Sequence, residues 1–292
     1  MAAAPKLAGA PITWGVCEVP GWGRQLDPSR VLAEIAGGGL SATELGPQGF
    51  LPADASAIRA RLTEHGLTLV GGFVPAVLHR DHSLASELER VDASARTLAD
   101  AGAGVLVLAA ETGSGGYEVT TQLSDVEWRT LEQGIAEVMR IGARYQLGVA
   151  LHPHYGTVIE RAAEVKRVLD TTDVGLCLDT GHLMVAGADP VEIAKYARGR
   201  VVHVHLKDVD ASLAARVRSR EIGYRDAVSA GLYRPLGDGD VDIATLVRLL
   251  RDAGYDGWYV MEQDLVLDGL SDDTPLRNAS RSMRYLRTLW DA

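Results

Sequence analysis

The sequence predicts one domain with the α/β fold of a closed (β/α)8 TIM barrel. Eight short apolar runs alternate with amphipathic segments along the 292 residues, and this alternation is typical of a parallel sheet covered by helices. Eight such units in a chain of this length favour a closed barrel over an open doubly wound sheet. No Gly-x-Gly-x-x-Gly turn follows the first run, which argues against a dinucleotide-binding fold. We therefore expect a single domain over residues 1–292.

The eight apolar runs are the predicted strands. Each is short and is bounded by polar residues, glycine or proline, as buried parallel strands are. They cover Ala8–Trp14, Ala42–Leu45, Leu67–Phe73, Gly104–Leu108, Leu147–His152, Val174–Asp179, Val201–Leu206 and Gly257–Glu262. Because parallel barrel strands all run the same way, their carboxyl ends should meet at one mouth of the barrel.

The segments between the strands have the apolar spacing of helices. Asp27-Pro28 and Asp189-Pro190 each place a capping carboxylate before a proline at the first helical position. The predicted helices cover Pro28–Ala36, Ala55–Glu64, Leu84–Ala101, Asp125–Tyr145, Ala162–Leu169, Pro190–Ala197, Ile243–Ala253 and, after the last strand, Thr274–Trp290.

One connection is longer than the others. Residues 207–242 form an insertion after the seventh strand, with a charged helical stretch at Ala211–Ala230. Long connections in compact domains are usually functional or disordered. Because this one leaves the carboxyl end of a strand, we expect it to form a lid or wall at the active face.

Composition and charge exclude several classes of partner. The net charge is −10 with a pI near 5.3, and no run of Lys or Arg offers a nucleic-acid surface, so we expect no nucleic-acid partner. No window approaches the ~20 apolar residues of a membrane span. No secretory signal is visible, which predicts a cytoplasmic protein without a membrane partner. The aromatic C-terminal helix ending at Trp290 could pack on its own barrel or on a second copy in a homo-oligomer.

Polar side chains gather at the ends of the fifth to eighth strands. Five of the eight histidines lie between positions 152 and 205, and four strand ends offer His152, Asp179, His205 and Glu262. Two imidazoles and two carboxylates suit a divalent ion such as Mn²⁺, Co²⁺, Fe²⁺ or Zn²⁺. We therefore predict a metal site at the barrel mouth, with His154 as the alternative to His152.

Further residues at the predicted mouth could contact a substrate. Each also has a structural explanation, such as a loop hydrogen bond, a salt bridge or core packing. His203 shares the parity of His205 but lies deeper, which favours a barrel-core role. The remaining candidates are Glu44, His182 and Lys207 for binding or proton transfer, and Trp14, Asp208 and Arg234 for substrate contact.

Several motifs resemble the xylose isomerase-like TIM-barrel superfamily of sugar isomerases, epimerases and dehydratases. They are Asp179-Thr-Gly-His182, His203-Val-His205-Leu-Lys-Asp208 and Gly257-Trp-Tyr-Val-Met-Glu262. Within this superfamily the chain is similar to the inosose (2-keto-myo-inositol) dehydratases, through His152-Pro-His154-Tyr-Gly-Thr157 and Gly237-Asp-Gly-Asp-Val-Asp242. Many superfamily members have Glu where this chain has His152.

The resemblance implies a lyase of inositol or carbohydrate catabolism that removes water from a cyclic polyol ketone through an enediolate. The implied cofactor is Mn²⁺ or Co²⁺, with Zn²⁺, Fe²⁺ or Mg²⁺ as alternatives. His154 or Glu44 would remove the proton next to the carbonyl, and His182 or Lys207 would protonate the departing hydroxyl. A metal-dependent ketose or inosose epimerase or isomerase, and a non-catalytic sugar-binding barrel, are the alternative functions. The acidic balance argues against an abasic-site endonuclease of the same superfamily.

Overall fold

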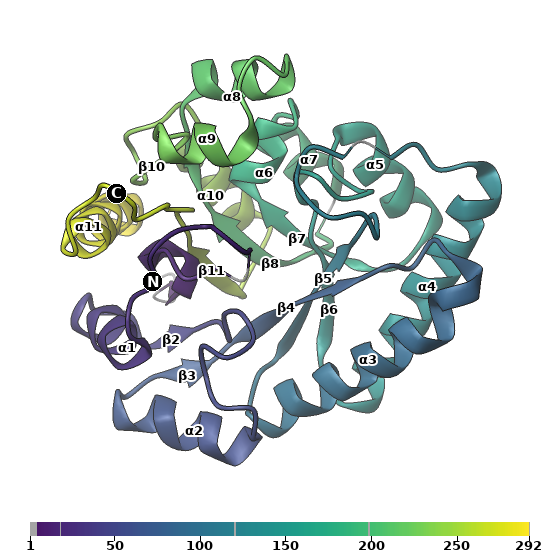
Figure 1. Ribbon diagram of the computed structural model, residues 1–292, viewed down its shortest axis with the longest axis horizontal. Coiled ribbons are helices and arrows are strands. Elements are labelled where there is room, and N and C mark those ends of the chain that lie inside the picture. Colours follow the sequence, from purple (N-terminus) through teal and green to yellow (C-terminus); the bar gives the residue numbers. More distant parts are fainter. Residues whose placement is uncertain (1–4, 18, 120, 198, 292) are drawn as a thin grey trace.

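The computed structural model describes residues 5–17, 19–119, 121–197 and 199–291, which form a nearly closed barrel of parallel strands surrounded by helices (Figure 1). The strands of the main sheet lie in the order β3-β2-β1-β11-β8-β7-β6-β5-β4. Their bounds are β1 Lys6–Gly9, β2 Ala42–Thr43, β3 Thr68–Leu69, β4 Gly71–Ala76, β5 Val105–Ala110, β6 Gly148–Leu151, β7 Gly175–Asp179, β8 Val201–Leu206 and β11 Trp258–Met261.

The barrel closes through its third strand, which is interrupted at Val70. β3 pairs with β2, whereas β4 pairs with β5. The amide of Val70 donates to the Thr43 carbonyl at 3.0 Å, and its own carbonyl accepts from Gly104 at 3.1 Å. The two ends of the sheet are therefore consecutive parts of one strand, and the predicted TIM-barrel architecture is confirmed.

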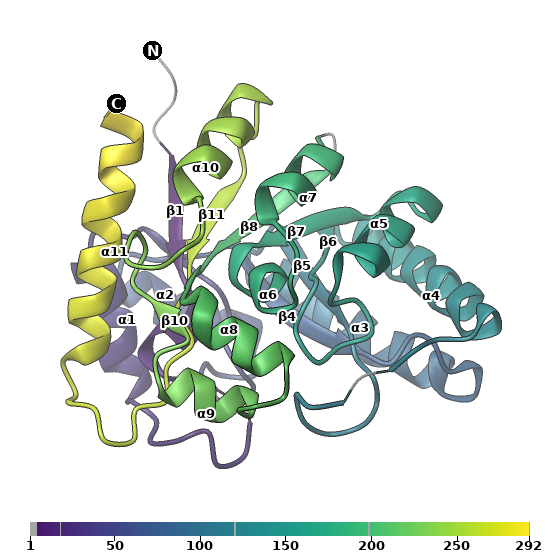
Figure 2. The same ribbon diagram turned by 90° about the horizontal axis from the view of Figure 1, so that it is seen from above.

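Helices pack around the outside of the barrel, and α11 lies on the same side as α1 (Figures 1 and 2). The predicted caps are present, because Asp27 accepts from Ser29 and Asp189 accepts from Val191 through their carboxylates. Within the described ranges, no helix is both long and apolar enough to cross a membrane. The helices are α1 Pro28–Gly37, α2 Ala55–Glu64, α3 Asp81–Asp100, α4 Asp125–Arg144, α5 Ala162–Thr171, α6 Thr180–Val185, α7 Pro190–Ala197, α8 Ala211–Arg218, α9 Tyr224–Ser229, α10 Ile243–Asp252 and α11 Thr274–Asp291.

The first strand differs from its prediction. The sequence predicts a strand over Ala8–Trp14, but β1 ends at Gly9 and Pro11–Trp14 forms a turn of 3-10 helix. Pro11 has no amide hydrogen for the strand ladder, and its fixed φ suits the start of a helix. Gly15 then ends the turn with a φ of 74°, a conformation that glycine adopts without strain.

The insertion after the seventh barrel strand is an ordered unit with its own small core. It contains α8, α9 and a two-stranded antiparallel ribbon of β9 (Asp208–Val209) and β10 (Tyr233–Arg234). Val185 of α6, Val209, Val217 and Tyr224 belong to one buried apolar cluster. α8 and α9 lie beside α6 at one end of the barrel (Figure 2), so the insertion is fixed next to the residues that follow β7 and β8.

Candidate metal and catalytic centre

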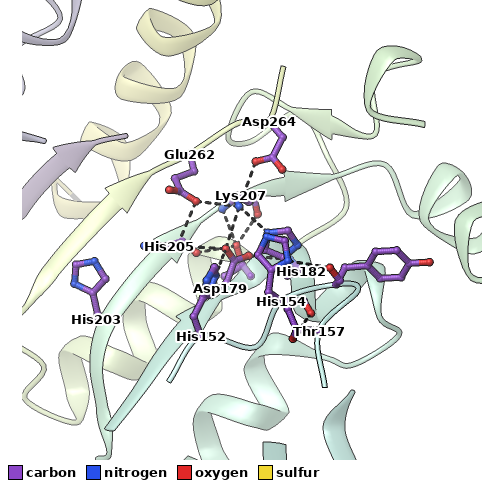
Figure 3. Close-up of polar contacts among 12 residues, drawn as sticks. His152, His154, Thr157, Asp179, His182, His203, His205, Lys207, Glu262 and Asp264 are labelled. Atoms are coloured by element: carbon purple, nitrogen blue, oxygen red, sulfur yellow. Dashed lines mark hydrogen bonds and ion pairs between the residues drawn. The ribbon is translucent and has the colours of Figure 1, made fainter. Parts of the chain in front are cut away.

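The four predicted metal ligands converge because they lie at the ends of neighbouring barrel strands. Asp179 ends β7 and is paired in register with His205 of β8. His152 directly follows β6, and Glu262 directly follows β11, the other neighbour of β8. The four side chains point toward one another at the mouth of the barrel (Figure 3).

The distances within this group are short. His152 Nε2 lies 3.1 Å from Asp179 Oδ2, and His205 Nδ1 lies 3.5 Å from the same oxygen and 3.3 Å from Glu262 Oε2. Asp179, His205 and Glu262 each offer a ligand atom, and these atoms all lie within 4.8 Å of one another. All four side chains are buried. The structure therefore brings the predicted ligands together.

The donor set fits a divalent ion. Nδ1 of His205 is buried without a hydrogen-bond partner and faces the carboxylates of Asp179 and Glu262, and an orphaned imidazole nitrogen next to carboxylates is a ready metal ligand. The other nitrogen of His205, Nε2, contacts Glu44 Oε1 at 2.9 Å. A metal-ligating histidine is usually oriented by such a contact between its second nitrogen and a carboxylate.

Glu44 lies at the centre of a second polar group next to the predicted ligands. Its Oε1 accepts from His203 at 2.7 Å as well as from His205. Burial raises the pKa of Glu44, but His205 and His203 outweigh this effect and hold its pKa well below the ordinary value. Glu44 is therefore an anion held by two imidazoles, and His203 has a partner inside the barrel.

Cys177 is also close to His152 and His205. Burial raises the pKa of its thiol to about 11. Because metals bind the thiolate and not the thiol, Cys177 is better explained as a packed residue of β7 than as a ligand.

Lys207 places a buried positive charge beside the ligands. Its Nζ lies 2.9 Å from Glu262 Oε2, 3.2 Å from Asp179 Oδ2 and 3.2 Å from Asp264 Oδ1. Burial lowers the pKa of Lys207, but the three carboxylates hold its pKa well above the ordinary value. Lys207 is therefore an ammonium paired with three carboxylates.

A closed ring of hydrogen bonds and one ion pair, which the sequence did not predict, links Lys207 to the insertion. Its Nζ also lies 3.0 Å from His182 Nε2, and His182 Nδ1 lies 3.4 Å from the hydroxyl of Tyr233. The Tyr233 hydroxyl contacts that of Tyr224 at 2.9 Å, and Tyr224 donates to Asp264 Oδ2 at 3.0 Å. Asp264 completes the ring by contacting Lys207. Its spacing of two residues from Glu262 was the available signal, since both lie on the same side of an extended chain.

His154 is a neutral imidazole next to this ring. Burial lowers its pKa well below 6.5, and the nearby His152 and Lys207 lower it further. Its Nδ1 lies 2.8 Å from the Tyr155 carbonyl, so Nδ1 carries the hydrogen and Nε2 is the nitrogen that can accept a proton. The ring of His154 lies against that of His182, with centroids 3.6 Å apart and the planes tilted by 37°.

A cavity of about 540 Å³ opens above the cluster. This volume is within the usual range for small-molecule sites. Asp179 and His182 do not line the cavity. Asp179 contacts the lining residues Lys207 and His152, and His182 contacts Lys207. The predicted site residues in the lining are Glu44, His152, His154, His205, Lys207 and Glu262, joined by Asp264.

Three residues predicted to contact a substrate do not line this cavity. Trp14 is 1% exposed, and its indole donates to Glu34 Oε2 at 2.9 Å. Asp208 accepts backbone hydrogen bonds inside the insertion. Arg234 is paired with Asp210 at 2.9 Å. Each has a structural partner that explains its position without a substrate.

Comparisons with known proteins identify the family of this barrel. Residues 32–289 match the family described as "Xylose isomerase-like TIM barrel". An inosose dehydratase from Geobacillus kaustophilus is 34% identical over 271 residues, which cover 89% of this chain and 87% of that protein.

Two solved structures show the same fold at low sequence identity. An L-ribulose 3-epimerase superposes with a TM-score of 0.71 at 16% identity, over 99% of this chain and 95% of that one. The IOLI protein, whose structure holds a zinc atom, superposes with a TM-score of 0.70 at 15% identity, over 96% and 97% of the two chains. The match over most of the sequence and the shared barrel show that the chain belongs to the xylose isomerase-like TIM barrel family.

Proposed function

We propose that this protein is a metal-dependent hydro-lyase that removes water from a cyclic polyol ketone, with an inosose as the first candidate substrate. Support comes from the 34% identity to an inosose dehydratase and from the residues that face the cavity. The observation that carries the proposal is that a neutral imidazole, His154, and an ammonium, Lys207, line one cavity beside a cluster of potential metal ligands. Loss of water from such a ketone needs both a base and an acid.

His152, Asp179, His205 and Glu262 are the residues that would hold the ion, for which Mn²⁺ or Co²⁺ is our first choice. A bound divalent ion would polarise the substrate carbonyl and stabilise the negative charge that develops on its oxygen. The chain supplies these four ligands from strand ends of a rigid barrel, so their positions are set before the substrate arrives.

His154 is our candidate for the base. Its low pKa keeps the imidazole neutral near pH 7, and the contact of Nδ1 with the Tyr155 carbonyl directs Nε2 to accept the proton from the carbon next to the carbonyl. Glu44 is the weaker candidate, because its Oε1 already accepts from His203 and His205. Nε2 of His154 can therefore accept a proton, whereas Oε1 of Glu44 already accepts hydrogen bonds from two histidines.

Lys207 is our candidate for the acid. It carries a proton, it lines the cavity, and contacts with His182 and Asp264 keep its ammonium there. The carbon–oxygen bond to the β-hydroxyl breaks as Lys207 protonates the departing oxygen, which leaves as water. His182 lies behind Lys207 and contacts its Nζ, which suits it to orient the ammonium.

Product analysis tests the proposal. The purified protein, treated with EDTA and reloaded with Mn²⁺ or Co²⁺, is incubated with a panel of inososes and ketoses in deuterated water and followed by mass spectrometry. Loss of one water from a cyclic ketone, abolished by EDTA and by His154→Gln but not by the exposed control His82→Gln, is the expected result. Deuterium incorporation with no loss of water would identify an epimerase or isomerase. Binding of a sugar with neither change would identify a non-catalytic barrel.

A further inference from the structure

Lys207 contacts the same carboxylate oxygens that a divalent ion would need. Its Nζ lies 3.2 Å from Asp179 Oδ2 and 2.9 Å from Glu262 Oε2. These two oxygens also face Nδ1 of His205, at 3.5 and 3.3 Å. Two cations at contact distance from one pair of buried oxygens repel each other strongly, because the protein interior screens charge weakly. The ammonium and the ion therefore compete for these oxygens.

Asp264 is a further anionic partner of Lys207 that lies outside the group of predicted metal ligands. Its Oδ1 lies 3.2 Å from Nζ, and its Oδ2 accepts from Tyr224, which is fixed by Tyr233. Across the described residues, the groups of three side chains close enough to share an ion do not include Asp264. Oδ1 also has no hydrogen-bond partner despite its burial. Asp264 is thus a carboxylate held by the insertion through Oδ2, and its Oδ1 forms an ion pair with the ammonium.

We propose that Lys207 is a built-in counter-cation of the ligand cluster, and that Asp264 is the positioning residue onto which its ammonium withdraws when a divalent ion binds. This inference rests on the proposed metal site and adds a residue pair that sets its affinity. Until an ion arrives, Lys207 keeps Asp179 and Glu262 close together despite their like charges. Once the ion has bound, Asp264 holds the Lys207 ammonium at the cavity, where it can act as the proposed acid.

The competition predicts opposite effects of two near-isosteric substitutions. Lys207→Met removes the competing cation and should tighten Co²⁺ binding by about tenfold or more, since hydrogen bonds between charged groups are worth about that factor. Asp264→Asn removes the alternative anchor, leaves the ammonium on Asp179 and Glu262, and should weaken Co²⁺ binding by about tenfold. Lys195→Met, at an exposed lysine paired with Glu192, is the matched control and should leave the affinity unchanged.

The double variant separates withdrawal of Lys207 from simple attraction between charges. If Asp264 acts by receiving the ammonium, Asp264→Asn should have little effect on Co²⁺ affinity in the Lys207→Met background. If Asp264 only attracts the ion through space, the two substitutions should be additive. Titrations of the apo proteins with Co²⁺, followed by its visible absorption and by calorimetry, give the four dissociation constants. Near-ultraviolet circular dichroism confirms that each variant is folded, and Tyr224→Phe offers a milder change of the same anchor.

The outcomes distinguish this inference from the proposed function. Additive effects, or an affinity that does not rise in Lys207→Met, would overturn the inference even if the wild-type protein binds the ion. A wild-type protein that binds neither Co²⁺ nor Mn²⁺ would contradict the metal-dependent function, yet binding by Lys207→Met alone would support the competition. If no variant binds either ion, both proposals fall.

Discussion

His205 faces Glu44 through Nε2 at 2.9 Å and keeps Nδ1 toward Asp179 and Glu262. Glu44 comes from the end of β2, across the barrel from β8, so one carboxylate orients a ligand of the candidate metal site from the opposite wall. The same oxygen of Glu44 accepts from His203, which fixes the carboxylate itself. This chain of contacts decides which nitrogen of His205 is available to an ion.

Glu44→Gln should weaken binding of Mn²⁺ or Co²⁺ by about 10- to 100-fold, because a neutral amide orients His205 less strongly than a carboxylate. Calorimetric titration of the apo protein measures the effect, with the exposed Glu192→Gln as the matched control. The opposite pattern, normal affinity together with lost hydrogen exchange next to the carbonyl, would show that Glu44 is the base and not an orienting residue.

His152 and His154 should separate metal binding from proton transfer. His152→Gln removes a nitrogen from the ligand group and should abolish tight binding of the ion. His154→Gln should retain the ion but slow exchange of the α-hydrogen by about 100- to 10,000-fold, the usual contribution of a general base. Metal analysis and exchange in deuterated water read out the two functions separately. If His154→Gln lost the ion and His152→Gln retained it, His154 would be the ligand instead of His152.

The sequence was sufficient to predict the barrel and the meeting of the four ligands. Parallel strands of a barrel end at one mouth, so a polar residue at the end of each strand can be placed there without knowing any side-chain geometry. Glu44 could be placed at the mouth for the same reason. Its partners could not, because contacts across a barrel depend on strand tilt and register, which short apolar runs do not specify.

Other features depended on tertiary packing. Asp264 and the tyrosines of the insertion meet only because α9 and β10 fold back over the strand ends. The sequence of residues 207–242 indicated helix, charge and a place at the active face, but not which side chains would make contact there. Trp14 was placed at the mouth because the first strand was predicted to extend to it. The chain turns at Pro11 instead, and Trp14 packs in the core against the barrel wall.

Asp208→Asn should destabilise the insertion without altering substrate affinity in the enzyme that remains folded. The carboxylate accepts from the amides of Val209, Gly237, Gly239 and Val241 at 2.8–3.1 Å. An asparagine NH₂ would face one or more of these donors, so we expect a loss of about 1–3 kcal/mol in the free energy of unfolding. Urea unfolding and limited proteolysis measure it, with Asp238→Asn as the control. Unchanged stability with a raised KM would restore Asp208 as a substrate contact.

The stability of the protein should fall in mild acid, and His79 offers a way to measure part of the effect away from the candidate site. His79 is 3% exposed and its Nδ1 has no hydrogen-bond partner. Burial and, to a smaller extent, Arg80 lower its pKa below the ordinary 6.5. In the unfolded chain the imidazole takes up a proton near pH 6.5, whereas in the folded chain it does so only at lower pH.

The contribution of His79 to stability is therefore complete above pH ~6.5 and is lost progressively as the pH falls toward its folded-state pKa. His79→Gln removes this proton uptake, so its free energy of unfolding should decline less steeply than that of the wild type between pH 7 and 5. Urea unfolding of the apo proteins at a series of pH values gives both slopes, and His82→Gln, at an exposed position of α3, is the matched control. Equal slopes for His79→Gln and the wild type would contradict this prediction. They would mean that His79 takes up a proton as readily in the folded chain as in the unfolded chain, despite its burial beside Arg80.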